Sequence, residues 1–141
     1  IATSASGGMP GATTGDDSGI YPDAVLEKNV LIMRTGTEED FTTYCEALIS
    51  GLSAGKYKIR LYNNLKSIDA SLTSTAKYQI VVGDIATDFT FPAGYDIRNN
   101  LTQWIEKEVT VDDSFLLRWG RMEGKTGTHR YPVNIIEIEK I

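Results

Sequence analysis

The chain contains very little of the residue types on which most catalytic and metal sites depend. Its 141 residues include one cysteine and one histidine. A single cysteine excludes an internal disulfide, and one cysteine with one histidine cannot supply the ligand set of a zinc site. The carboxylates lie in no context that indicates acid–base catalysis. We therefore expect no metal or other cofactor and no enzymatic activity.

The sequence also lacks a long apolar segment and an excess of basic residues. Its longest clean apolar run, Val30 to Met33, is far shorter than the roughly 20 residues of a membrane-spanning helix. Lys and Arg number 14 against 19 Asp and Glu, so the net charge is −5. This balance gives no general attraction to nucleic acid or to an anionic membrane. The expected partners are identical subunits and other proteins, without direct nucleic-acid contact and without a small-molecule substrate.

Residues 1–28 differ in composition from the rest of the chain. They are rich in glycine, serine and threonine and contain few sizeable apolar residues. Such a segment cannot bury enough surface to fold alone, so it becomes ordered only against its own domain or a neighbour. We interpret residues 1–28 as an extended arm and residues 29–141 as a single domain. Fully extended, the arm would reach roughly 90 Å.

The pattern of residues 29–141 predicts an α/β (α+β) domain. Apolar residues recur at helical spacing over residues 38–54 and 97–108, which predicts two helices. Continuous or alternating apolar residues predict strands at 30–33, 56–62, 78–82, 115–122 and 131–138. The expected order is strand, helix, two strands, helix, two strands, in a mixed sheet of about five strands with the helices mainly on one face. The first strand is expected at the centre of the sheet, and the last two strands are expected to form a hairpin.

The turn Thr35-Gly36-Thr37 stands where a phosphate-binding loop would stand, between a strand and a predicted helix. Such a loop binds phosphate through free backbone N–H groups and the positive end of the helix. Here Glu38, Glu39 and Asp40 already occupy that end. Each carboxylate would repel a phosphate by on the order of 1 kcal/mol. We therefore interpret the turn as the start of a helix and not as a cofactor site.

The predicted hairpin carries the basic cluster of this acidic chain, formed by Arg118, Arg121, Lys125, His129 and Arg130. One interpretation is a solvated turn whose charges prevent the strand edge from pairing. The other is a contact patch for an acidic surface, such as that of an identical subunit. The sequence leaves both open.

The single cysteine, Cys45, falls on the apolar stripe of the first predicted helix. That position indicates a packing role, because a catalytic thiol paired with a histidine would have to be accessible.

Residues 41–88 combine a predicted helix, FTTYCEALISGL, with a strand that ends in a polar turn, YKIRLYNN. A loop and the strand of YQIVVGDIATDF follow. In this order of elements the segment resembles the tail-terminator and neck-type proteins of tailed bacteriophages. The chain departs from that pattern because a strand and an arm precede the helix. The resemblance implies a ring-forming virion protein and transfers no functional residue to this sequence.

These observations lead to one main hypothesis and two alternatives. The main hypothesis is a structural subunit of an ordered assembly, such as a virion component or a filament, located in a virion or another extracellular assembly. Its expected subunit contacts are Ile20, Tyr21, Val25 and Leu26 in the arm and Arg121, Lys125 and Arg130 in the hairpin. The first alternative is a small flavodoxin-like domain that binds a cofactor or ligand. The second is a domain of a larger surface protein, with the arm as a linker.

Overall fold

The chain folds as an arrangement of β-strands. The computed structural model describes residue 15 and residues 30–34, 44–66, 76–121 and 129–141, and no helix occurs in these residues. The strands there are β1 (Val30–Arg34), β2 (Tyr44–Ile49), β3 (Gly55–Tyr62), β4 (Ala76–Val82), β5 (Ile85–Asp88), β6 (Ile105–Val111), β7 (Phe115–Arg121), β8 (His129–Val133) and β9 (Ile135–Lys140). The expected α/β (α+β) class is therefore wrong.

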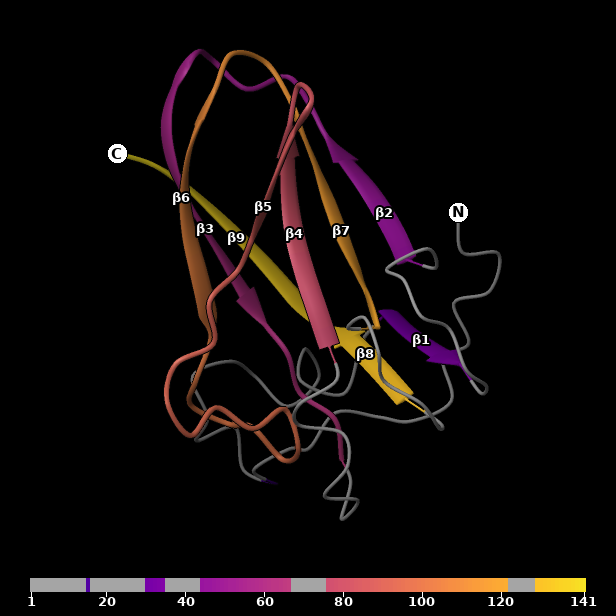
Figure 1. Cartoon of the computed structure of the whole chain (residues 1–141). Helices are drawn as coiled ribbons and strands as arrows, with labels where there is room; N and C mark the ends of the chain where they lie inside the picture. The colour runs from indigo at the N-terminus through magenta and orange to yellow at the C-terminus, as the bar shows by residue number, and fades with distance from the viewer. Residues whose placement is uncertain (1–14, 16–29, 35–43, 67–75, 122–128) are drawn as a thin grey trace.

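Two larger sheets and one strand pair make up the fold (Figure 1). The first sheet has the order β2-β7-β4-β5, the second has the order β6-β3-β9, and β1 pairs with β8. All of these pairings are antiparallel. Only Asn134 separates β8 from β9, so this part of the chain leads from the strand pair into the second sheet. The two larger sheets enclose one hydrophobic core, which gives a β-sandwich.

The core is built from side chains at every second position of the strands. On β3, Tyr57, Ile59 and Leu61 are buried, whereas Lys58 and Arg60 between them face outward. On β7 the corresponding buried residues are Phe115, Leu117 and Trp119. These residues from the two sheets belong to one contact cluster. This period of two is the one expected for antiparallel sheets that are packed on one face and solvated on the other.

The helix predicted over residues 38–54 is wrong in the part that the structure describes. Residues 44–49 form β2, and residues 50–54 lead to β3 without helical structure. Cys45, Ala47 and Ile49 pack against the core. Cys45 and Ile49 are four residues apart, and this spacing places side chains together both on a helix and on a strand. The apolar spacing was therefore compatible with a helix and with a strand. Hydrogen-bonded pairing with β7 makes this segment a strand.

The helix predicted over residues 97–108 is also wrong. Asn99 has a φ of 52°, in the left-handed region, and the Asn100 side chain accepts hydrogen bonds from the backbone N–H groups of Thr102 and Gln103. Asparagines form such local turns readily and thereby compete with helix formation. The strand β6 then begins at Ile105. With no helix in the described residues, the expected placement of two helices on one face is wrong as well.

The strands predicted at 30–33, 56–62, 78–82 and 115–122 are confirmed in position as β1, β3, β4 and β7. The single strand predicted at 131–138 is wrong, because Asn134 divides it into β8 and β9, which belong to different sheets. The predicted pairings are wrong as well. Among the described strands β1 pairs with β8 alone, so it is not the centre of a sheet. The predicted hairpin is wrong because β7 lies between β2 and β4, whereas β8 pairs with β1. Strand β5 was not predicted; it follows β4 through a tight turn at Gly83, which has a φ of 58°. Glycine at the first central position is typical of a two-residue hairpin turn.

Candidate functional site

A groove of about 270 Å³ opens between β5 and β6, which are edge strands of the two larger sheets. We call it the edge groove; its lining residues are Val82, Ile85, Thr87, Lys107, Glu108, Val109 and Thr110. In Figure 1, β5 runs between β4 and β6 on this side of the sandwich. At the edge groove the two sheets approach each other, and no further described strand closes the gap between β5 and β6.

Both strands that flank the edge groove have one backbone edge that pairs with no other described strand. Among the described strands, β5 pairs only with β4, and β6 pairs only with β3. The other edge of each strand therefore presents backbone N–H and C=O groups that the two sheets do not use. Such an edge is able to pair with another extended segment.

Ile85 is an apolar side chain of β5 that the sandwich leaves uncovered. It lies opposite Val82 in the hairpin, and Val82 packs against the core. Even so, Ile85 is 72% exposed, more than any other large hydrophobic residue of the described chain. Burying such a side chain stabilises a fold or a complex by up to about 2 kcal/mol. The edge groove thus contains apolar surface that the described residues do not cover.

Lys107 is the cation of the edge groove. Side chains alternate along β6, so Lys107 points to the same side as the buried Ile105 and Val111. Its neighbours Glu106 and Glu108 point outward, where Glu108 pairs with Lys56 at 2.5 Å. The Lys107 ammonium makes no ion pair or hydrogen bond within the described residues. It is therefore available to a carboxylate that enters the edge groove.

The opposite situation holds where the loop of residues 89–104 meets the end of β3. Here Tyr62, Asn63, Tyr95 and Asn100, which we call the asparagine cluster, are all buried. The Asn63 side-chain amide donates to the carbonyl of Pro132 at 2.8 Å, and the Tyr95 hydroxyl donates to Asn63 Oδ1 at 3.1 Å. The Tyr62 hydroxyl donates to the Asn100 carbonyl at 2.6 Å. These mutual bonds satisfy the buried polar groups, so the cluster fastens the loop and presents no open binding site.

Burial also keeps the tyrosines of this cluster neutral. It raises the pKa of Tyr62 to about 12 and raises the pKa of Tyr95 above its ordinary value as well. A phenol whose pKa is raised by burial is not suited to act as a base near neutral pH. The asparagine cluster is therefore a structural feature.

The cysteine of the chain is poorly placed for nucleophilic chemistry, and the described residues contain no metal-binding group. Cys45 is half-buried against the core, and burial raises the pKa of its thiol, which lowers the thiolate fraction. No group of three or more His, Cys, Asp or Glu side chains that could hold a metal ion occurs in the described parts of the chain. The flavodoxin-like alternative loses its basis, because that fold needs helices and a parallel sheet.

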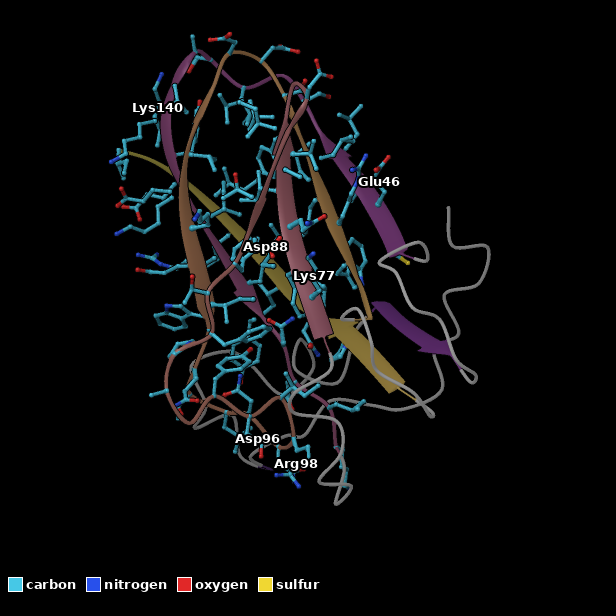
Figure 2. The ribbon with its side chains drawn as sticks, viewed as in Figure 1. Glu46, Lys77, Asp88, Asp96, Arg98 and Lys140 are labelled. Carbon is cyan, nitrogen blue, oxygen red and sulfur yellow. The ribbon has the colours of Figure 1, made fainter. Side chains whose placement is uncertain are left out.

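The charged side chains labelled in Figure 2 are spread over the surface and do not converge on one site. The labelled residues belong to separate contacts, which are Glu46 with Arg118, Lys77 with Asp88, Asp96 with Arg98, and Lys140 with Ser53. The hydrogen bonds from Arg98 lower the pKa of the Asp96 carboxyl. Exposed ion pairs of this kind contribute at most about 1 kcal/mol each. They are a property of the solvated faces and mark no functional centre.

The residues predicted as subunit contacts lie mostly outside the described chain. This holds for Ile20, Tyr21, Val25, Leu26 and Lys125. Arg121 is the last residue of β7, and Arg130 lies in β8. Of the basic cluster, Arg118 forms an ion pair with Glu46 at 2.5 Å, so its charge is already compensated. The contact role of these residues stays a prediction.

Ile85 and Lys107, the two most informative residues of the edge groove, were not predicted as site residues from the sequence. A signal was present for each. The Val82-Gly83-Asp84-Ile85 segment has the glycine of a tight hairpin. Ile105 to Val111 alternates between apolar and polar residues except at Lys107, which stands at an apolar position. A lysine at an inward position of a strand is the exception that would have marked this edge.

Comparison with known proteins provides no further assignment, because no family model, no curated protein and no solved structure matches this chain. The bacteriophage resemblance depended partly on a helix in residues 41–52, of which residues 44–49 form β2. No helix in the described residues is long and apolar enough to cross a membrane.

Proposed function

We propose that this chain is a structural subunit of an ordered protein assembly. In this proposal the arm, residues 1–28, of one subunit contacts a neighbouring subunit, and the sandwich is the repeating body. A filament is one such assembly, and a virion component is the other, on the basis of the resemblance described above. Identical subunits and other assembly proteins are then the partners, and the chain needs neither a substrate nor a cofactor.

The single observation that carries this proposal is the edge groove. Two strands with open edges flank it, and Ile85 stays 72% exposed inside it. Natural sandwiches usually protect such edges, since an open edge invites pairing with another chain. An edge that pairs with a strand from another subunit is both protected and useful for assembly. Backbone hydrogen bonds then provide affinity, and the alternating side chains fix the register.

A domain of a larger surface protein is the second candidate. The β-sandwich architecture favours it, because many cell-surface domains share this architecture. This support is an analogy of fold and says nothing about a site. The second candidate predicts a monomer in which residues 1–28 act only as a linker.

Light scattering of the full chain and of a variant without residues 1–26 separates the two candidates. We expect the full chain to form oligomers or longer assemblies at micromolar concentration and the shortened chain to be a folded monomer. Circular dichroism must show the same β-signal for both. A full chain that stays monomeric would contradict the assembly proposal and favour the second candidate. A shortened chain that still assembles would contradict the proposed role of the arm.

A further inference from the structure

The edge groove has the size and the flanks of an acceptor site for an added strand. Its volume of about 270 Å³ is below the roughly 300–1,000 Å³ of typical small-molecule sites. It is sufficient for a few side chains of an extended peptide. Of the two flanking strands, β6 has seven residues and β5 has four, so β6 offers the longer ladder. A segment that pairs along β6 would extend the β6-β3-β9 sheet by one strand.

The side chains that line the groove specify the composition of such a segment. Val82, Ile85 and Val109 provide an apolar surface, and Lys107 provides a cation without a partner among the described residues. Side chains two residues apart on a strand point to the same side. The complementary segment therefore has an apolar residue with an acidic residue two positions away.

This chain contains such a segment in its own arm. In Asp23-Ala24-Val25-Leu26-Glu27 the side chains of Asp23, Val25 and Glu27 would lie on one side of a strand. On this side of the strand a carboxylate lies two residues before Val25 and another lies two residues after it. The added strand can therefore run in either direction and still bring one carboxylate to Lys107. The other side of this strand would carry Ala24 and Leu26.

The segment that enters the edge groove must come from a second copy. Only Lys28 and Asn29 separate Glu27 from Val30, the first residue of β1, and each residue spans at most about 3.5 Å. β1 pairs with β8, whereas β6 lies at the edge of a different sheet. In Figure 1, β1 and β6 lie on opposite sides of the molecule, with β3, β4 and β9 between them. A link of two residues cannot cross that separation.

We infer that residues 23–27 of one subunit pair along β6 of the next, with Val25 in the edge groove and Asp23 or Glu27 at Lys107. This inference rests on the proposed assembly function and names its acceptor site. Because arm and groove are different surfaces of the same chain, the contact is head-to-tail, and repetition produces rings or filaments.

A charge exchange in the full chain tests the inference, with light scattering and electron microscopy as readouts. We expect Lys107→Glu to weaken assembly at least tenfold in critical concentration, and Asp23→Lys combined with Glu27→Lys to do the same. The triple variant, which exchanges both partners, should recover most of the assembly. Lys66→Glu is the matched control, since Lys66 is exposed outside the groove and the change in net charge is the same. Its critical concentration should stay within twofold of the original.

Ile85→Asp is a second, independent variant. Because Ile85 is exposed in the single subunit, this variant should fold normally and fail to assemble. Hydrogen exchange should show that the amides of residues 105–111 become protected in the assembled chain and lose this protection in Lys107→Glu.

The outcomes separate this inference from the proposed function. If the chain assembles and needs its arm, but Lys107→Glu and Ile85→Asp assemble normally, the function stands and the acceptor site is wrong. If Lys107→Glu assembles more strongly, Lys107 guards the edge against pairing, and the inference is overturned. A full chain that never assembles contradicts both.

Discussion

The edge groove and the asparagine cluster belong to the same sandwich, but the groups of the cluster are buried and paired, whereas those of the groove are left uncovered by the described residues. In the asparagine cluster, buried amides and phenols of loop 89–104 and β3 satisfy one another by hydrogen bonds. In the edge groove, two strand edges, an apolar side chain and a cation lie uncovered within the described chain. The first arrangement completes a subunit by itself. The second has the features of a surface that another chain completes.

The largest effect should come from comparing two isoleucines of the β4–β5 hairpin. Ile80 is fully buried, whereas Ile85 is 72% exposed. Ile80→Ala should lower the free energy of unfolding by about 2–5 kcal/mol, because it leaves a cavity in the core. Ile85→Ala should change it by less than about 0.5 kcal/mol. Urea unfolding at a concentration where the chain is monomeric measures both. Similar losses for the two variants would mean that the groove is covered within the subunit.

Asn100→Ala should have the next largest effect. Its side chain donates to the carbonyls of Asn63 and Gln103 and accepts from the backbone N–H groups of Thr102 and Gln103. Losing these bonds inside the protein should cost about 2–3 kcal/mol in urea unfolding. Asn99→Gly is the control, since Asn99 is exposed and glycine adopts its positive φ readily. An Asn100 variant as stable as this control would show that the cluster contributes little.

Alkaline pH should weaken the asparagine cluster. Burial raises the pKa of Tyr62 to about 12, so the unfolded chain, whose tyrosines ionise near pH 10, loses protons before the folded chain does. The contribution of Tyr62 to the free energy of unfolding should therefore be constant below about pH 9 and fall between roughly pH 10 and 12. Urea midpoints at several pH values measure the slope. Tyr62→Phe should reduce this slope, and an unchanged slope would contradict the assignment to Tyr62.

The smallest effect is expected at Trp119. Its Nε1 is the buried side-chain polar atom without a hydrogen-bond partner among the described residues, unlike the atoms of the asparagine cluster. Trp119→Phe removes this unpaired donor, which offsets the lost packing of the larger ring. We expect the free energy of unfolding to change by less than about 1 kcal/mol. A loss above about 2 kcal/mol would indicate that the indole N–H has a partner in the folded chain.

The sequence located several strands but not their partners, and it did not locate β2, which was predicted as part of a helix. Its apolar residues Cys45 and Ile49 satisfy a helical and a strand period equally, so periodicity alone could not decide. Ala47, which also packs against the core, is too small to give a strong signal. The helix prediction that began at residue 97 was wrong for a different reason. The turn at Asn100 depends on hydrogen bonds of its side chain, which an apolar stripe in the sequence does not reveal.

Only one half of the proposed contact, the arm segment, could be predicted from the sequence. The arm segment with Val25 and its contact role were inferred from composition, and both stay predictions. The acceptor was not foreseen, because Ile85 and Lys107 are far apart in the sequence and come together only through the two sheets. Neither residue belongs to a recognisable motif.

By itself, the sequence determined the positions of most strands. Apolar and polar residues alternate locally along the chain, and in a pleated strand successive side chains point to opposite faces. It also determined the acidic balance and the distinct composition of residues 1–28. Only the tertiary structure decided that residues 44–49 are a strand, which strands are neighbours, and that β5 and β6 are edges among the described strands. These properties depend on hydrogen bonds and contacts between distant segments, which no local pattern specifies.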